Sequence, residues 1–441
     1  MTPFAVKAIQ LLLSLSLLIV LHELGHFIPA KLFKTRVEKF YLFFDVKFSL
    51  FKKKIGETVY GIGWLPLGGY VKIAGMIDES MDKEQMAGPP QPWEFRSKPA
   101  WQRLIIMLGG VTVNIIVGFV IYMGILYFYG RNITTNEDIP QGFAVTQQFK
   151  EYGFRDGDHI LTVNGEPFED VMEINRYMFL RDVSKVEVKH SDGSIESISV
   201  PEDVGTKMFQ NDSHFPFSPM RLAVIDTIYP DYPANDVGFE KGDKIISVNG
   251  KPIQFFEEST PLIAANGKNE NLIVVSRNNQ IDSIKVTAND EGKIGINAFG
   301  KELKLGKTEI KYSLTESIVG GFGYGYNTLK DYVSQFKYVF TKKGATQVGG
   351  FGAIGNLFPD AWDWQSFWAT TALISIILAF MNILPIPALD GGHVMFLLYE
   401  IVTGRKPNDK FMEYAQMVGF FILIALVLFA NGNDIYRWLF E

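Results

Sequence analysis

The feature that most constrains this chain is a set of four apolar blocks, each long enough to cross a lipid bilayer. A hydrocarbon core of about 30 Å requires about 20 apolar residues in a helix. Three of the blocks contain no charged residue, and the first contains only the ionisable side chains of His22, Glu23 and His26. The blocks cover residues 8–30, 104–130, 364–389 and 414–433. The sequence therefore predicts a polytopic α-helical membrane protein with four transmembrane helices.

The first block has an alternative interpretation, a cleaved signal peptide. A signal peptide has a shorter apolar run that ends in a small-residue cleavage site. The block before Lys31 is longer than such a run and lacks a site of this kind. We therefore expect residues 1–30 to form the first transmembrane helix.

Composition excludes some classes of partner and ligand. The formal net charge is -6, whereas a nucleic-acid-binding protein needs a basic face. The chain contains no cysteine, so it has no disulfide and no thiolate ligand. Any bound metal must be held by nitrogen and oxygen atoms.

The charges beside the apolar blocks predict the orientation. The segment 31–103 carries more Lys and Arg than Asp and Glu, and Arg405, Lys406 and Lys410 follow the third block. By the positive-inside rule, both segments face the cytoplasm. With four spans, the first and third helices run in the same direction in either orientation.

The long segment between the second and third blocks contains an internal repeat. YGFRDGDHILTVNG at 152–165 recurs as VGFEKGDKIISVNG at 237–250, which indicates two copies of one small domain. The pattern resembles the turn and strand of PDZ domains, which bind peptides by adding them to a sheet as an extra strand. The alternative is a pair of spacer modules with closed grooves.

Two further segments have their own patterns. Residues 38–75 mix aromatic and β-branched residues with lysine and break at Gly68 and Gly69, which is typical of short strands and hairpin turns. They are too polar to span the bilayer and too apolar for a simple loop. We therefore expect them to dip into the membrane interface. Residues 316–340 fit an amphipathic helix, although their glycines weaken that interpretation.

HELGH at 22–26 is an H-E-x-x-H pattern. Helical spacing of i and i+4 places His22 and His26 on one face, with Glu23 beside them. Two imidazoles at this separation can bind Zn²⁺, and the glutamate can then take a proton from the metal's water. The alternative is that the three side chains satisfy one another or reach the membrane surface near Lys31.

A catalytic zinc site needs a third protein ligand. Asp390 follows the third apolar block, whose downstream end lies at the same membrane depth as the histidines because the two spans are parallel. We therefore expect Asp390 to be that ligand. The alternative is that Asp390 is the N-cap of a helix beginning near Gly391.

The same stretch contains a break in the apolar helix. Pro385 and Pro387 leave backbone groups unpaired, which is tolerated at membrane depth where they line a wet cavity. Asn382, just before the break, either hydrogen-bonds the substrate or bridges helices. His393 is a weaker candidate, better explained as a structural or supporting residue than as a ligand.

The two motifs together have a known counterpart. HELGH at 22–26 and NILPIPALDGGH at 382–393 resemble the paired motifs of the site-2 protease family of intramembrane zinc metalloproteases. LGGYVKIAG at 67–75 is similar to that family's membrane-reentrant β-hairpin. A tandem PDZ pair between the second and third spans is typical of its bacterial members. The resemblance covers essentially the whole chain.

This resemblance implies roles for particular residues. One Zn²⁺ would be held by His22, His26 and Asp390, and Glu23 would be the catalytic acid and base. The substrate helix would unwind and add to the hairpin as a strand. The residues that would bind it are Asn382, Gly68, Gly69, Tyr70 and Val71.

The resemblance also implies substrates and a location. The substrates would be single-span membrane proteins, namely an anti-sigma factor already trimmed outside the membrane or a remnant signal peptide, cleaved in the envelope stress response. The protein would lie in the bacterial inner membrane with its active site near the cytoplasmic side. The PDZ pair would be periplasmic and act as a size filter.

Together these inferences give an expected domain order. The segments are transmembrane helix 1 (1–30), a cytoplasmic or re-entrant β region (31–103), transmembrane helix 2 (104–130), PDZ domain 1 (131–220), PDZ domain 2 (221–310), a periplasmic amphipathic connector (311–363), transmembrane helix 3 (364–389), a cytoplasmic loop (390–413) and transmembrane helix 4 (414–433). Two alternative functions are a membrane-anchored PDZ adaptor with a structural or lost metal site and a metal transporter. Zinc stoichiometry with metal-dependent cleavage separates the three.

Overall fold

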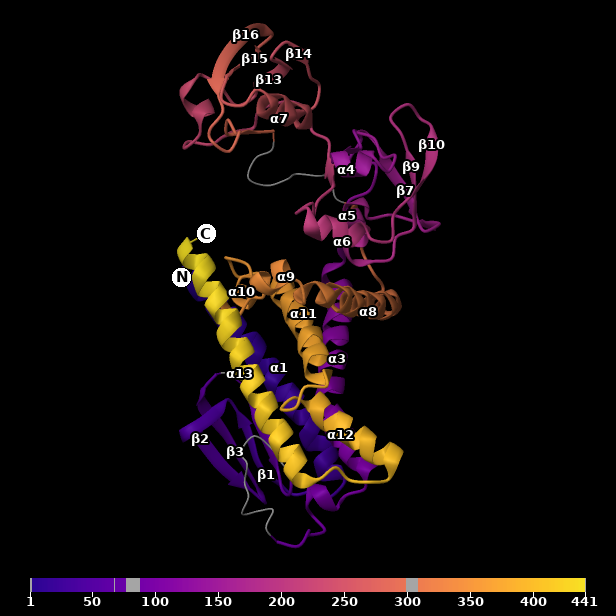
Figure 1. Cartoon of the computed structure of the whole chain (residues 1–441), viewed down its shortest axis with the longest axis vertical. Helices are drawn as coiled ribbons and strands as arrows, with labels where there is room; N and C mark the ends of the chain where they lie inside the picture. Colours follow the sequence, from indigo (N-terminus) through magenta and orange to yellow (C-terminus); the bar gives the residue numbers. More distant parts are fainter. Residues whose placement is uncertain (1, 67, 77–87, 299–307, 441) are drawn as a thin grey trace. The chain divides into compact units, whose positions relative to one another are not determined.

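The computed structural model describes residues 2–66, 68–76, 88–298 and 308–440. Leu67 of the expected hairpin, residues 77–87 of the expected β region and residues 299–307 of the expected second PDZ domain lie outside these ranges. The chain divides into two compact units (Figure 1). Residues 1–130 and 311–441 make up the first, which we call the helical unit, and residues 131–310 make up the second, which we call the repeat unit.

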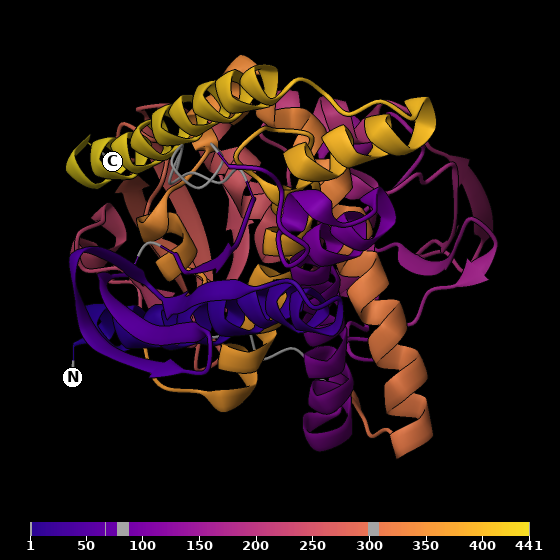
Figure 2. The same ribbon diagram turned by 90° about the horizontal axis from the view of Figure 1, so that it is seen from below.

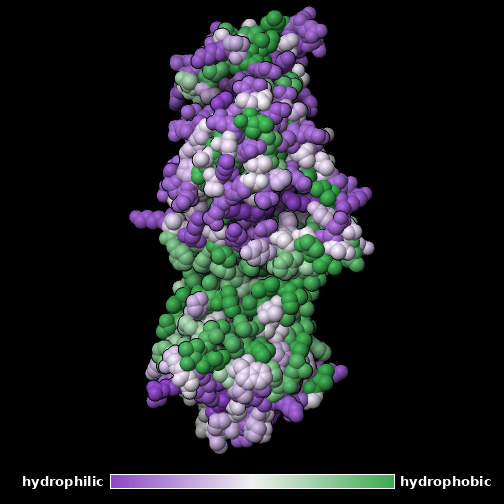
Figure 3. Space-filling model, turned by 90° about the vertical axis from the view of Figure 1, so that its right-hand side faces the viewer, coloured by the Kyte–Doolittle hydropathy of each residue, from purple (hydrophilic) through white to green (hydrophobic). Residues whose placement is uncertain are grey.

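Four helices of the helical unit are long and apolar enough to cross a membrane within the described part of the chain. They are α1 (Pro3–Leu32), α3 (Ala100–Tyr129), α11 (Trp364–Ile383) and α13 (Asp409–Phe440). Figure 3 shows hydrophobic colour over the middle of this unit's surface and hydrophilic residues at its lower end. These helices confirm the predicted helical membrane protein.

Helices α1 and α3 approach closely through glycines. A Cβ atom added to Gly25 of α1 would overlap the carbonyl of Gly109 in α3, and one added to Gly109 would overlap that of Gly25. Small residues at a crossing let two backbones pack without an intervening side chain, which is a common basis for association of membrane helices. This contact fixes the end of α1 that carries the HELGH motif against α3.

A four-stranded sheet follows α1 in the chain. Its strands are β1 (Val37–Leu42), β2 (Phe44–Ile55), β3 (Thr58–Leu65) and β4 (Tyr70–Ile73), in the spatial order β2-β3-β1-β4. β1 pairs in parallel with β3 and antiparallel with β4. The view in Figure 2 shows the sheet beside α1, and both β1 and β4 contact this helix. β4 is an edge strand, since no described strand pairs with its outer side.

After α11, the chain breaks and begins a new helix. α11 ends at Ile383, and α12 (Asp390–Thr403) begins after the segment that contains Pro385 and Pro387. The segment 390–413, expected as a loop, therefore holds a helix over most of its length. α12 packs on α3, and the Arg103 guanidinium donates a 2.6 Å hydrogen bond to the Glu400 carboxylate.

The predicted amphipathic helix before the third span is present. α8 (Leu314–Val339) begins at a capping box in which the Ser313 hydroxyl accepts from the backbone N–H of Glu316. Such a box supplies partners for backbone groups at the helix start, which offsets the weak helix propensity of its glycines. Two short helices, α9 (Lys342–Gln347) and α10 (Phe351–Gly355), follow before α11.

The repeat unit contains two four-stranded sheets of corresponding order, β10-β9-β7-β8 and β16-β15-β13-β14. Each sheet has its own buried hydrophobic cluster, one within residues 139–217 and one within 223–294. In both copies the duplicated sequence forms a strand that enters an Asn-Gly turn. Asn164 and Asn249 adopt positive φ of 55° and 52°, a conformation that asparagine tolerates better than most residues.

The elements of the repeat unit have the following bounds. The strands are β5 (Arg131–Ile133), β6 (Phe143–Val145), β7 (His159–Val163), β8 (Glu166–Pro167), β9 (Lys185–Lys189), β10 (Ile195–Ser199), β11 (Phe217–Pro219), β12 (Thr227–Ile228), β13 (Lys244–Val248), β14 (Lys251–Pro252), β15 (Glu270–Arg277), β16 (Gln280–Thr287), β17 (Ile296–Asn297) and β18 (Thr308–Ile310). The helices are α4 (Gln147–Lys150), α5 (Ile174–Leu180), α6 (Val204–Gln210) and α7 (Phe256–Ala265).

Candidate metal centre

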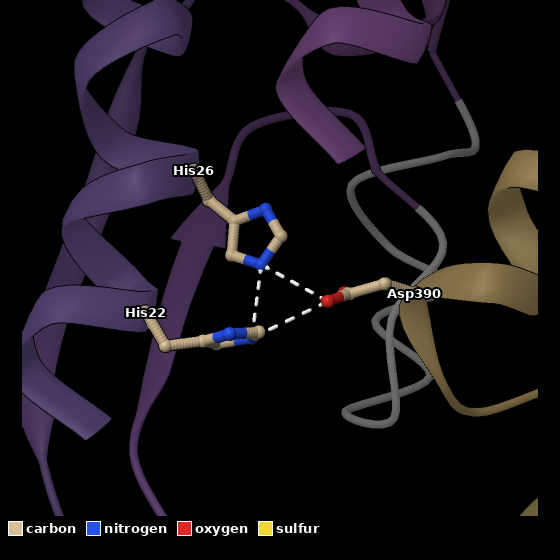
Figure 4. Close-up of side chains that lie close together, drawn as sticks. All are labelled: His22, His26 and Asp390. Atoms are coloured by element: carbon tan, nitrogen blue, oxygen red, sulfur yellow. Dashed lines mark hydrogen bonds and ion pairs between the residues drawn. The ribbon is translucent and has the colours of Figure 1, made fainter. Parts of the chain in front are cut away.

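Helix α1 places His22 and His26 one turn apart on one face, as their spacing predicts. Their Nε2 atoms lie 3.2 Å apart. The Oδ2 atom of Asp390 lies 3.3 Å from Nε2 of His22 and 3.4 Å from Nε2 of His26. Figure 4 shows both rings turned from α1 toward the carboxylate at the start of α12. The three atoms form a nearly equilateral triangle, which we call the ligand triangle.

The ligand triangle fits a tetrahedral zinc ion. With Zn–N and Zn–O bonds of about 2.0–2.1 Å, two ligand atoms of a tetrahedron lie about 3.3–3.4 Å apart. Oδ2 of Asp390 is buried and, despite the nearby rings, accepts no well-aligned hydrogen bond from the described residues. A buried carboxylate oxygen without a proton donor is costly unless a cation neutralises it. The spacing favours a bound cation, and so does a buried carboxylate oxygen that meets two imidazole nitrogens only at ion-pair distance.

Each imidazole is also held through its second nitrogen. Nδ1 of His26 lies 2.8 Å from the backbone carbonyl of Ile106 in α3. Nδ1 of His22 lies 3.2 Å from the side-chain Nδ2 of Asn114, also in α3. A contact to a carbonyl, like that of His26, fixes the ring orientation of a metal-binding histidine.

Gly110 of α3 leaves room for the two rings. A Cβ atom at this position would overlap Nε2 of His26 and would lie 2.6 Å from Cε1 of His22. Because the ring atoms concerned belong to the ligand triangle, only glycine fits here without moving a candidate ligand.

Asp390 is the first residue of α12, and the N-cap is Leu389. The alternative that Asp390 is the N-cap is therefore wrong. The loop before it is held by Gln416 of α13, whose Oε1 accepts a 2.5 Å hydrogen bond from the backbone N–H of Ala388. The Nε2 atom of Gln416 lies 2.8 Å from Nε2 of His393, which places this histidine in a supporting network outside the ligand triangle.

A cavity of about 660 Å³ opens beside the ligand triangle. Its lining includes Glu23, Asp390 and the β4 residues Tyr70 and Val71. Glu23 is 9% exposed, so its carboxylate is shielded from bulk solvent while it faces the cavity. The site therefore combines candidate ligands, a carboxylate and space for a substrate chain.

The β4 edge is close to the catalytic candidate. Val71 of β4 and Glu23 of α1 line the same cavity. A Cβ atom at Gly69 would overlap the backbone of Tyr41 and the side chain of Ile19, so glycine allows β4 to lie close to α1. Strand β4 thus borders the cavity at the height of the HELGH motif.

The predicted site residues differ in where the structure places them. His22, Glu23, His26, Asp390, Gly69, Tyr70 and Val71 all line the cavity. Gly68 and Asn382 do not line it, and Asn382 lies half-buried in the last turn of α11.

Sequence reasoning missed three residues that shape the site: Gly110, Asn114 and Gln416. Two of them carried a detectable signal, because Asn114 and Gln416 are polar residues inside membrane-length apolar blocks. Gly110 gave no comparable signal, since glycines are common in membrane helices.

Comparison with known proteins identifies the family. The sequence pattern of peptidase family M50 matches residues 10–426. The chain belongs to this family, that of the site-2 proteases. The zinc metalloprotease RasP of Oceanobacillus iheyensis is 25% identical over 97% of this chain and 98% of its own length. The regulator of sigma E protease of Haemophilus influenzae is 26% identical over 97% of this chain and 98% of its own length.

Membership of family M50 agrees with the chemistry of the site. Two imidazoles and one carboxylate are a donor set that catalytic zinc uses in hydrolases, and the relatives carry the name of zinc metalloproteases or of a protease. This M50 protein is therefore a zinc metalloprotease, with four helices suited to a membrane.

Proposed function

We propose that this protein is a zinc-dependent intramembrane endopeptidase that cleaves single-span membrane proteins. The observation that carries the proposal is the position of the ligand triangle within helices of membrane length. His22 and His26 lie inside the candidate span Pro3–Leu32, and Asp390 follows the candidate span Trp364–Ile383. A hydrolytic centre at this depth acts on peptide bonds that lie in the bilayer.

His22, His26 and Asp390 would hold the zinc, which when bound supplies a Lewis acid and an activated water. Glu23 lines the cavity beside these residues. Its carboxylate accepts a proton as water attacks the peptide carbonyl, and it returns the proton to the leaving nitrogen. The proline-containing break after α11 borders this cavity through Ala388 and Leu389, and such irregular backbone is tolerated where a cavity contains water.

A transmembrane substrate must unwind before it can be cleaved, because the carbonyls of a helix are hydrogen-bonded within it. The outer edge of β4 offers backbone groups that an extended chain can pair with. Tyr70 and Val71 on this strand face the same cavity as Glu23. Strand addition at β4 would therefore place a substrate carbonyl next to the catalytic carboxylate. Gly68 and Gly69 would form the approach to the strand, and Asn382 of α11 would help to position the substrate.

The choice of substrate follows from the relatives and the repeat unit. One relative is named regulator of sigma E protease, which supports an anti-sigma factor, already trimmed outside the membrane, as a substrate in the envelope stress response. Remnant signal peptides are a second substrate of the same chemistry. The two sheets with corresponding strand order support tandem PDZ domains at 131–220 and 221–310 that act as a size filter.

The charge distribution supports a location in the bacterial inner membrane. The basic segment 31–103 and the residues Arg405, Lys406 and Lys410 would face the cytoplasm. The active site would then lie near the cytoplasmic side, with the sheet β2-β3-β1-β4 as a membrane-reentrant element. The repeat unit would be periplasmic.

The proposal is tested by metal-dependent cleavage in detergent. The purified protein is incubated with two tagged single-span anti-sigma substrates, one trimmed and one that keeps its bulky extracytoplasmic domain. Each is tested with the zinc-loaded protein, after zinc is removed, and after zinc is restored. We expect cleavage of the trimmed substrate only, with one zinc per chain, and recovery when zinc is restored. Cleavage that persists without zinc, or a zinc-loaded protein that cleaves neither substrate, contradicts the proposal.

A further inference from the structure

Asn114 is a fully buried polar residue in α3 to which the proposed chemistry gives no role. Its exposed fraction is 0%. Its side-chain nitrogen Nδ2 lies 3.2 Å from Nδ1 of His22, while its Oδ1 atom accepts no hydrogen bond from the described residues. A buried amide in an apolar helix is costly when one of its ends is unused. Asn114 therefore contacts a candidate zinc ligand and has an unused acceptor.

The orientation of this amide determines what His22 can bind. A neutral imidazole carries one proton, on Nδ1 or on Nε2. When Nδ2 of Asn114 donates to His22, Nδ1 is the acceptor, and the proton is on Nε2, the atom of the ligand triangle. That tautomer cannot bind a metal through Nε2, because its lone pair is used by the proton.

Rotation of the carboxamide removes the conflict. A half-turn exchanges Oδ1 and Nδ2 of Asn114 at almost the same positions. Oδ1 then accepts a proton from Nδ1 of His22, and the Nε2 lone pair faces the ligand triangle. The same rotation gives Oδ1 a proton donor and moves Nδ2 to the position at which Oδ1 has no partner, so its consequence is the tautomer of His22 rather than a gain in hydrogen bonds.

The Nδ1 atom of His26 also has a hydrogen-bond partner, but this partner cannot change between donor and acceptor. Its Nδ1 atom lies 2.8 Å from the backbone carbonyl oxygen of Ile106. A carbonyl oxygen only accepts, so the proton of His26 stays on Nδ1 and Nε2 remains available to a metal. For His22, the side chain of Asn114 determines which ring nitrogen carries the proton.

We propose that Asn114 is a positioning residue of the zinc site. In the zinc-bound protein its Oδ1 atom holds the Nδ1 proton of His22 and so selects the tautomer that offers Nε2 to the metal. The inference rests on the proposed role of His22 as a zinc ligand. The backbone of residue 114 is held separately, because the Ser375 hydroxyl donates a 2.7 Å hydrogen bond to its carbonyl oxygen.

The test measures zinc affinity in the absence of substrate. Purified full-length protein in detergent competes with a chelator of known affinity, and the zinc dissociation constant is compared for the wild type, Asn114→Leu and Asn114→Asp. Leucine has neither a donor nor an acceptor, whereas aspartate retains the acceptor that His22 needs. We expect Asn114→Leu to weaken zinc binding by about 10- to 100-fold and Asn114→Asp to bind within about threefold of the wild type.

Two further variants separate positioning from general packing. Ser375→Ala removes a buried hydrogen bond at the same residue but leaves the carboxamide in place, so its zinc affinity should match the wild type. Asn114→Ala replaces Asn114→Leu if leucine prevents folding, and the same loss is expected.

The inference is overturned if Asn114→Leu, or its alanine substitute, binds zinc as tightly as the wild type. It is also overturned if Asn114→Asp loses as much affinity as leucine does, or if Ser375→Ala does. A wild type that binds no zinc would instead contradict the proposed function.

Discussion

Gln416 in α13 holds the backbone of Ala388, two residues before the candidate ligand Asp390. Its Oε1 atom accepts a 2.5 Å hydrogen bond from the Ala388 N–H. Ala388 has φ of 77°, a left-handed conformation that is unfavourable for a residue with a Cβ atom. A bond from the last long helix thus stabilises the strained loop that places Asp390 in the ligand triangle.

The first prediction follows from this bond. Gln416→Leu leaves the Ala388 N–H without its acceptor, so the loop should relax and Asp390 should lose its fixed position. We expect substrate cleavage to fall by about 10-fold, with weaker zinc binding. Gln416→Glu keeps an acceptor and should retain more activity than leucine. Equal cleavage by the wild type and Gln416→Leu would show that the loop holds its shape without α13.

The second prediction concerns the space beside the ligand triangle. Gly110→Ala adds a methyl group that overlaps Nε2 of His26. We expect loss of bound zinc and a decrease in cleavage of about 100-fold or more. The matched control is Gly124→Ala in the same helix, because a Cβ atom at Gly124 meets no atom within 4 Å. If the two variants bind zinc equally well, Gly110 does not limit the space of the metal site.

The third prediction tests strand addition at β4. Val71→Pro removes the backbone N–H of a β4 residue that lines the cavity with Glu23, whereas Val71→Ala keeps it. We expect the proline variant to cleave at least about 10-fold more slowly than the alanine variant, because proline cannot donate to a paired strand. Zinc content, measured on the same samples, should be unchanged in both. Equal cleavage rates would rule out pairing of the substrate with this edge.

The fourth prediction concerns pH and the two copies in the repeat unit. Asp158 is fully buried, and its Oδ1 atom pairs with His190 Nδ1 at 2.6 Å. Burial alone would lower the pKa of His190, but hydrogen bonds to Asp158 and Glu196 outweigh it, and the pKa is raised. The pairing therefore stabilises the first copy below the ordinary histidine pKa of about 6.5, and this contribution is lost as pH rises through the higher folded-state value.

The second copy replaces this histidine with a group that does not titrate near neutrality. The corresponding Asp243 is fully buried and pairs with Arg277 at 2.7 Å. Burial raises the pKa of Asp243, but hydrogen bonds from Arg277 and the backbone lower it below its usual range. Its contribution is present above the ordinary aspartate pKa and is lost only in acid.

Hydrogen exchange of the full-length protein, corrected for the intrinsic pH dependence, distinguishes the two copies. From pH 6 to pH 9 we expect protection to decrease in strands β7 and β9 but not in β13 and β15. The variant His190→Gln should remove the pH dependence of the first copy. A parallel loss of protection in both copies would mean that the His190 pairing does not control it.

Sequence was sufficient for features that a local pattern encodes. The four apolar blocks predict helices α1, α3, α11 and α13, and the HELGH spacing alone places His22 and His26 on one face. The third candidate ligand, Asp390, followed from the parallel direction of two spans. Each of these inferences depends on periodicity or on topology, which are properties of the chain rather than of its packing.

The remaining features depend on contacts between distant segments. Asn114 lies 92 positions from His22 in the chain, and no local pattern shows that the two side chains meet. The tight crossing at Gly25 and Gly109 is invisible for the same reason. Helix α12 was only an alternative to the expected loop at 390–413, because its sequence follows a proline-containing break that is compatible with either.

The proposed mechanism is tested most directly by a comparison of the wild type with Glu23→Gln. The substitution removes the proton acceptor but keeps the size of the side chain, and Glu23 is not part of the ligand triangle. Cleavage of a tagged single-span substrate in detergent and zinc content are measured on the same samples. We expect Glu23→Gln to retain one zinc per chain and to lose cleavage. Equal cleavage by the two proteins would contradict the proposed role of Glu23.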